Sequence, residues 1–392
     1  MIKFPYSKPE ITTEDINTVV DTLKSGYLTQ GDKLIEFENS ISKSFGSKNT
    51  IVCNSGTAAL HMIYSELGLN SKNALLTSSI TFLATANAAR MCNAPVVLAD
   101  VDPETGLMTA ETIENALKIS KYKIAVITVV HLAGRVCNLK AISKVAKKFG
   151  CLIVEDACHA PGAYLNDKNI KENRIGACKY SVACTFSFHA IKHITMGEGG
   201  CITTNNSKIS ESLRLARSHG IIRDLSKLES KPEKNPIWYY EMQKLGWNYR
   251  ADEMSCALGT SQLKRLNINI KKRRKLVKIY DKKFKNNIYI NTPKKPINKE
   301  NHVWHLYAIA VDFEKISKTR GEIMQILLER GIGTQVHYIP LFLQPYYKDK
   351  FSKKYDGAIK YYNKTLSIPL YPNLSLEDIE HIADTINKII IK

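Results

Sequence analysis

The stretch "TFSFHAIKHITMGEGG", residues 185–200, places one lysine between two β-rich segments. The segment "SVACTFSF" (181–188) precedes Lys192, and "GEGGCITTN" (197–205) follows it, so the lysine lies in a connection between two predicted strands. A lysine that such a connection shields from water has a lowered pKa and can form a Schiff base with an aldehyde. Position alone also fits an ordinary surface lysine.

Helical patterns alternate with short β-branched segments from the N-terminus to about residue 250. Residues 12–26 predict a capped helix that ends at Gly26, and its apolar stripe consists of Ile16, Val19, Val20 and Leu23. The β-rich segments end in polar residues and include 94–102, 124–134 and 151–160. This alternation predicts an α/β domain with a mostly parallel sheet.

The pattern changes near Asp252. Residues 252–284 form one long helical pattern, and beyond it the sequence predicts a strand and two helices, at 302–313, 319–331 and 376–391. We therefore expect two domains: a large α/β domain over residues 1–251, and a linking helix with a smaller α+β domain over residues 252–392.

The composition restricts the class of protein. The net charge is +19, but the basic residues are mostly lysines spread along the chain. The densest run, Lys271–Lys275, falls in the predicted long helix and is interpreted as a solvated helix face. We expect no nucleic-acid partner; a basic surface also suits a small anionic substrate.

No apolar run could span a bilayer or serve as a signal peptide, which predicts a cytoplasmic protein with no membrane partner. Nine scattered cysteines, never spaced C-x-x-C, indicate neither a disulfide framework nor a metal site.

Two further features follow predicted strands, where open α/β sheets bind ligands. In "NSGTAAL" (54–60) a strand turns into a helix, whose free N–H groups and dipole favour a phosphate. Ser55 there can also be a simple N-cap. Asp156 ends an apolar strand, with His159 just after it, and a carboxylate in that setting needs a partner. The partner is either a capping hydrogen bond or a protonated nitrogen heterocycle.

These motifs resemble those of the DegT/DnrJ/EryC1/StrS family of sugar-nucleotide aminotransferases, which use pyridoxal 5'-phosphate (PLP) and have the aspartate-aminotransferase fold (type I). The resemblance covers nearly the whole chain and is strongest to the subgroup of pseudaminic acid synthesis. Its motifs, in order, are Ser25–Gly31, Asn54–Leu60, Thr81–Ala89, Glu155–Ala163, Thr185–Gly200, Arg217–Gly220, Gly246–Leu263 and Gly331–Leu341.

The resemblance implies roles around the cofactor ring. Lys192 would bind PLP as a Schiff base and later shuttle the proton. Asp156 would pair with the ring nitrogen, which makes the ring an electron sink. His159 would lie near the phenolic oxygen, and Phe82 would stack on the ring face.

The resemblance also implies how the phosphate is held. Gly56, Thr57 and Ser187 would bind it from one chain. Asn248 would reach it from the partner subunit, so the enzyme is expected to be a homodimer with shared active sites.

Five further positions are candidates for binding the nucleotide-sugar: Thr29, Gln30, Arg250, His337 and Tyr338. An arginine suits a diphosphate because its planar fork donates two hydrogen bonds at once. Each position also has a structural alternative, namely a salt bridge for Arg250 and a satisfied buried ring for His337 and Tyr338.

The implied reaction moves the amino group of L-glutamate to C4 of a UDP-4-keto-6-deoxy-N-acetylhexosamine and releases 2-oxoglutarate. One alternative is another keto-sugar nucleotide, linked to dTDP, GDP or UDP and aminated at C3 or C4. A second is a pyridoxamine-phosphate-dependent sugar dehydratase, but such enzymes carry histidine where this chain has Lys192; His193 comes one position later. A third is a non-catalytic binding protein, which would be expected to lose Lys192 or Asp156.

Overall fold

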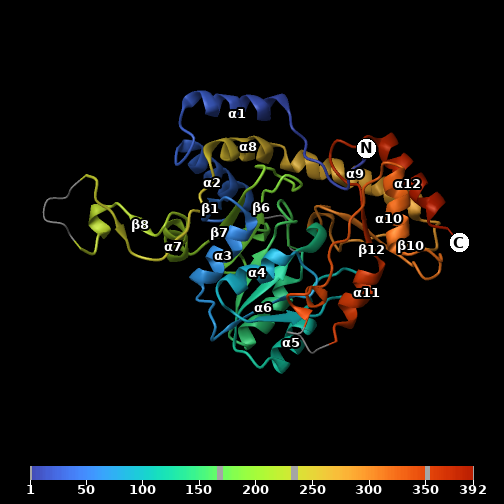
Figure 1. Cartoon of the computed structure of the whole chain (residues 1–392), viewed down its shortest axis with the longest axis horizontal. Coiled ribbons are helices and arrows are strands. Elements are labelled where there is room, and N and C mark those ends of the chain that lie inside the picture. The colour runs from blue at the N-terminus through green and yellow to red at the C-terminus, as the bar shows by residue number, and fades with distance from the viewer. Residues whose placement is uncertain (1, 166–170, 231–236, 349–353, 392) are drawn as a thin grey trace.

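The chain is described by a computed structural model over residues 2–165, 171–230, 237–348 and 354–391. Within these ranges a seven-stranded sheet forms the larger part, a three-stranded sheet forms the smaller part, and a two-stranded arm projects from the body (Figure 1). The arm consists of β8 (Ile221–Ile222) and β9 (Glu241–Met242). No helix among the described residues combines the length and the apolar character that crossing a bilayer requires.

The seven-stranded sheet is mostly parallel, as predicted. Its order is β1-β7-β6-β5-β4-β2-β3, and β7 runs antiparallel to both of its neighbours. Side chains alternate between two core clusters: Val52 and Ile153 face one, and Ile51 and Val154 face the other. Because both faces are buried, the strands are almost continuously apolar. They are β1 (Asn49–Cys53), β2 (Ala74–Ser78), β3 (Val96–Ala99), β4 (Ile124–Val130), β5 (Leu152–Asp156), β6 (Ala183–Ser187) and β7 (Gly200–Thr204).

Helices cover both faces of this sheet, which gives three layers (Figure 1). One cluster is completed by α3 (Gly56–Glu66), α4 (Leu83–Met91) and α7 (Ser207–Arg217). The other is completed by α2 (Asp32–Phe45), α5 (Ala110–Ile119), α6 (Leu139–Lys148) and α8 (Glu253–Lys264). Short 3-10 helices lie at Leu132–Gly134, Lys171–Asn173, Leu225–Lys227, Lys299–Asn301 and Leu341–Leu343.

The smaller part has its own core around an antiparallel sheet. The sheet contains β10 (Ile290–Asn291), β11 (Tyr307–Val311) and β12 (Thr365–Ile368). Its core cluster includes side chains from α9 (Leu266–Phe284), α10 (Arg320–Glu329) and α12 (Leu376–Ile389), while α11 (Asp356–Lys364) packs on the main core. The predicted strand and two helices are found here. The division of the chain at residues 251 and 252 stays a prediction.

The long helical pattern after Asp252 is two helices, not one. They meet at Arg265, which ends α8 and caps α9. The guanidinium of Arg265 donates to the buried carboxylate of Asp15, with Nη2 2.7 Å from Oδ2. The junction therefore lies where the two helices meet the N-terminal helix.

The interpretation of the basic run Lys271–Lys275 as a solvated face is wrong for one residue. Its three lysines are exposed, but Arg273 is buried. Nη1 of Arg273 donates to the backbone carbonyls of Trp304, His305 and Leu370, at 3.3, 3.3 and 2.6 Å. The helical period turns this residue towards the core, where three carbonyls compensate for its lost hydration.

The N-terminal helix α1 (Thr13–Ser25) has the predicted ends, and most of its apolar stripe is exposed. Thr12 forms a capping box with Asp15, and Gly26 ends the helix with a left-handed backbone. The buried residues are Asp15 and Thr22. The apolar stripe faces solvent in the single chain, with exposed fractions of 54%, 37% and 52% for Ile16, Val20 and Leu23.

A buried carboxylate joins α2, β1 and α7. Glu38 accepts hydrogen bonds from the amide of Val52 (3.0 Å) and from Nη1 of both Arg214 and Arg217 (2.6 Å each). The side chains of Glu38 and Arg217 are 6% and 9% exposed, so water cannot replace either partner. Removing one charge would leave the other buried and unpaired.

We predict that Glu38→Ala lowers the free energy of unfolding by roughly 3–5 kcal/mol, because Arg217 loses its buried counter-charge. Urea denaturation followed by circular dichroism measures the change. Glu36→Ala is the matched control: it removes an exposed pair with Lys33 and should cost less than about 1 kcal/mol. Equal losses in the two variants would contradict the prediction.

Candidate active site

A cavity of about 660 Å³ lies at the carboxyl ends of β4, β5 and β6. Val130, Asp156 and Ser187, the last residues of these strands, all line it. Further walls come from the residues that follow β4 and β5, from the starts of α3 and α4, and from the β6–β7 connection. Tyr6 and the C-terminal segment 335–339 also contribute. Ligands of open α/β sheets bind at this edge.

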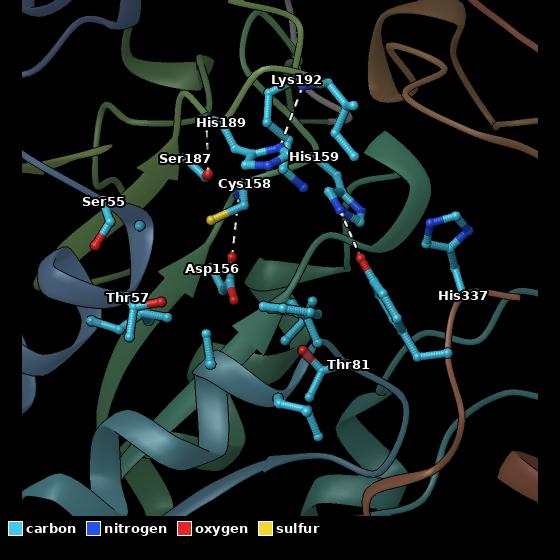
Figure 2. Close-up of a pocket in the computed structure, with 18 of the residues that line it drawn as sticks. Ser55, Thr57, Thr81, Asp156, Cys158, His159, Ser187, His189, Lys192 and His337 are labelled. Atoms are coloured by element: carbon cyan, nitrogen blue, oxygen red, sulfur yellow. Dashed lines mark hydrogen bonds between the residues drawn. The ribbon is translucent and has the colours of Figure 1, made fainter. Parts of the chain in front are cut away.

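The structure brings most of the predicted site residues together around this cavity (Figure 2). Those that line it are Gly56, Thr57, Phe82, Asp156, His159, Ser187, Lys192, His337 and Tyr338. Four predicted residues do not line the cavity of their own chain: Thr29, Gln30, Asn248 and Arg250. Backbone bridges hold two of these, Thr29 to Asp252 and Asn248 to Ser218.

The start of α3 forms a cradle that fits a phosphate. The hydroxyl of Ser55 caps the helix by accepting from the amide of Ala58 (3.0 Å), so the N-cap reading of Ser55 is correct. The amides of Gly56 and Thr57 are first-turn donors that the helix itself does not use. A Cβ on Gly56 would lie 2.9 Å from the Cβ of Ser187, so only glycine permits this approach. The free N–H groups of Gly56 and Thr57, the hydroxyl of Ser187 and the dipole of α3 can therefore all act on one anion.

Asp156 is held by two neutral donors. Its Oδ2 accepts from the hydroxyl of Thr85 (2.8 Å), and its Oδ1 accepts from the amide of Cys158 (3.2 Å). Thr81 and Thr85 are joined by a further hydroxyl contact of 2.9 Å, which fixes the orientation of Thr85. The carboxylate is 6% exposed and, among the described residues, has no cation within hydrogen-bond distance. It is therefore set up to bind a protonated nitrogen.

Lys192 belongs to the cavity and is not an ordinary surface lysine. Its backbone amide donates to the carbonyl of His189 (2.9 Å), which closes a turn in the β6–β7 connection. Burial lowers the pKa of the Lys192 amine, and the neighbouring Cys158 and Asp156 only partly oppose this effect. The amine therefore loses its proton at a lower pH than an exposed lysine and becomes a nucleophile.

His159 is neutral and has a defined tautomer. Burial, with the nearby Lys192 as a smaller cause, holds its pKa well below the usual value. Its Nδ1 accepts from the amide of Ala133 (3.2 Å), so the proton is on Nε2. Nε2 lies 3.2 Å from the hydroxyl oxygen of Tyr338 and donates to it (Figure 2). The Tyr338 hydroxyl proton is thereby left for another acceptor.

His337 is both a satisfied buried ring and a cavity residue. It is 5% exposed, and its Nδ1 lies 2.9 Å from the hydroxyl of Ser367 on β12. Burial lowers its pKa to about 3, so the ring is neutral.

Arg250 has no ion pair among the described residues, and its salt-bridge alternative is not observed.

The sequence did not point to Tyr6 and Cys158, which line the cavity, or to Thr85, which donates to Asp156. A signal existed for Thr85, because it follows Thr81 by four residues within the motif Thr81–Ala89. In the structure the two hydroxyls are in contact at the start of α4. Cys158 lies inside the motif that contains Asp156. Tyr6 has no local signal, since only tertiary structure brings it to the cavity.

Comparisons with known proteins show the family of the chain. The family model described as the DegT/DnrJ/EryC1/StrS aminotransferase family matches residues 9–387. A UDP-4-amino-4,6-dideoxy-N-acetyl-beta-L-altrosamine transaminase of Campylobacter jejuni is 36% identical over 389 residues, which cover 99% of this chain and 97% of that protein.

Solved structures extend the similarity to the fold. Helicobacter pylori PseC, an aminotransferase of pseudaminic acid biosynthesis, has a TM-score of 0.88 and 31% identity over 99% of both chains. The PLP form of Streptococcus pneumoniae Spr1654 has a TM-score of 0.85 and 26% identity, also over 99% of both chains. The fold is thus that of the type I PLP enzymes, as predicted. The chain belongs to the DegT/DnrJ/EryC1/StrS family and is a PLP-dependent sugar aminotransferase.

Proposed function

We propose that this enzyme transfers the amino group of L-glutamate to C4 of a UDP-4-keto-6-deoxy-N-acetylhexosamine. The product is a UDP-4-amino-4,6-dideoxy sugar for pseudaminic acid or a related surface glycan. The observation that carries the proposal is the meeting of Lys192, Asp156 and the free amides of α3 in one cavity. The names of the Campylobacter and Helicobacter relatives support the choice of sugar.

The residues present fit PLP as the cofactor. Gly56, Thr57 and Ser187 would hold its phosphate, and Asp156 would hold its ring nitrogen in the protonated state. When bound, PLP supplies an aldehyde that accepts the amino group and a ring that delocalises the electron pair left on carbon. Phe82, which is 57% exposed at the start of α4, would cover one face of the ring.

Lys192 would act as the base and acid of both half-reactions. Its lowered pKa makes the neutral amine available to accept a proton from the α-carbon of glutamate. The same amine would later deliver a proton to C4 of the sugar. Burial keeps His159 neutral, and its ring donates a hydrogen bond to Tyr338. His159 therefore carries no positive charge that would attract the diphosphate of the substrate.

The same proposal includes a homodimer with shared sites. The stripe of Ile16, Val20 and Leu23 on α1 is exposed in the single chain and would form part of the interface between the subunits. The four candidate residues that lie outside the cavity of their own chain, Thr29, Gln30, Asn248 and Arg250, would complete the partner's cavity. Arg250 would then offer its free guanidinium to the diphosphate.

The reaction is tested with purified holoenzyme. Adding L-glutamate should bleach the yellow cofactor, and adding the UDP-4-keto sugar should restore the colour and give a 4-amino product by NMR. Lys192→Ala should do neither, since it removes both the cofactor's attachment and a proton transfer worth about 10²–10⁴-fold. Turnover of dTDP- or GDP-sugars with UDP-sugars ignored would refute the proposed substrate.

We predict that Asp156→Asn lowers kcat/KM by about 10²–10³-fold, because an amide cannot stabilise the positive ring nitrogen. Steady-state kinetics and the cofactor's absorbance spectrum measure the effect. Thr85→Ser keeps the hydroxyl that donates to Asp156 and serves as the control, with activity near wild type. Full activity in Asp156→Asn would remove this residue from the mechanism.

We predict that the double substitution Ile16→Glu, Leu23→Glu separates the subunits, because charges replace the apolar stripe of α1. Sedimentation should show the wild type at twice the 44.1 kDa chain mass and the variant at the mass of one chain, with lower kcat/KM. Ile119→Glu, at an exposed position on α5, is the control and should stay dimeric. A fully active wild-type monomer would disprove the shared site.

A further inference from the structure

The N-terminal segment is fixed to the smaller part of the structure by backbone hydrogen bonds. The amide of Phe4 donates to the carbonyl of Gly331, and the amide of Gly333 donates back to the carbonyl of Phe4, both at 2.8 Å. The amide of Leu370 donates to the carbonyl of Tyr6 (3.1 Å). Phe4 itself is buried in the core of that part. Residues 4–6 therefore have a defined backbone position next to the C-terminal elements.

The next residue ties this segment to the lysine loop. Ser7 is 7% exposed, and its hydroxyl donates to the carbonyl of Ile191 (3.2 Å), directly before Lys192. Tyr6 is thus held between two anchors, one on the smaller part of the structure and one beside Lys192. Its side chain lines the cavity, although more than 180 residues of sequence separate it from Lys192.

Tyr6 completes an aromatic wall along one side of the cavity. Its ring centroid lies 5.4 Å from that of His337, which lies 4.9 Å from that of Tyr338, which in turn lies 5.9 Å from that of Phe82. His337 lies across the cavity from Ser55 and Thr57 at the phosphate cradle (Figure 2). The wall is therefore at the end where a substrate, and not the cofactor phosphate, has to fit.

The hydroxyl of Tyr6 is available to a ligand. The side chain is half-buried, and no group of the described residues forms a hydrogen bond with its hydroxyl. Burial raises the pKa of Tyr6, so the hydroxyl keeps its proton and can donate. An aromatic ring with a free polar tip is the usual makeup of a site that binds an amphipathic ligand. A hexose has this character, with C–H faces and a rim of hydroxyls.

We propose that Tyr6 is a specificity-determining residue that contacts the sugar ring of the nucleotide-sugar. Its ring covers a C–H face of the hexose, and its hydroxyl forms a hydrogen bond with a polar group of the sugar. The proposal rests on the proposed function, since it concerns the sugar substrate of that reaction. It adds the N-terminal segment to the substrate-binding machinery.

The test separates the two half-reactions. Tyr6→Phe should lower kcat/KM for the keto-sugar by about 3–10-fold, the worth of one hydrogen bond. Tyr6→Ala should lower it at least about tenfold, because the covering ring is lost as well. The rate of bleaching by L-glutamate should stay within about twofold in both, since the amino acid does not need the wall. Tyr122→Ala, at an exposed tyrosine outside the cavity, is the control.

Calorimetry gives a readout that does not depend on turnover. Binding of UDP-N-acetylglucosamine to the holoenzyme should weaken in Tyr6→Ala, whereas binding of UDP alone should not. Equal weakening of both, or slower bleaching by glutamate, would assign Tyr6 to general support of the cavity and overturn the proposal. Unchanged sugar kinetics would do the same. A wild-type enzyme that ignores UDP-sugars but aminates another keto-sugar nucleotide would refute the proposed substrate alone, and the variants would then be compared on that sugar.

Discussion

The N-terminus of α3 can lie against β6 and β7 only because Gly56 and Gly200 lack side chains. A Cβ on Gly200 would lie 2.5 Å from the carbonyl carbon of Ser55. This close approach sets the first-turn amides of α3 beside Ser187 at the end of β6. Since β5 pairs with β6, the same strand order brings Asp156 next to them. The contact between Gly200 and Ser55, together with the order of the strands, therefore positions three features. These are the start of α3, the carboxylate of Asp156 and the loop that carries Lys192.

Burial makes the histidines around this centre neutral. His159, His305, His337 and His193 all have a pKa below the ordinary value, chiefly because the interior disfavours their charged form. They can therefore give and accept hydrogen bonds without adding positive charge beside Lys192. His193, the residue that raised the dehydratase alternative, is 4% exposed and does not line the cavity; its ring lies 5.3 Å from that of His305. Lys192, and not His193, lines the cavity.

Local signals predicted much of the fold and the centre of the site. Capping at Thr12, the glycine at position 26 and the β-branched segments before Asp156 each depend on neighbouring residues, so they can be read from one stretch of chain. A hydrophobic period, by contrast, shows that a helix has an apolar face but not what covers it. This is why the sequence does not show that the stripe of α1 is exposed in the single chain, and why Arg273 was expected to be exposed. Tyr6 could not be found either, because backbone pairing with segments more than 300 residues away sets its position.

The anchoring of residues 4–7 has a practical consequence for making this protein. Phe4 is buried and bonded through both its amide and its carbonyl, and Tyr6, only two residues later, lines the cavity. An affinity tag fused ahead of this segment would start within a few residues of the cavity. A fusion placed after the last turn of α12 would leave the N-terminal segment undisturbed.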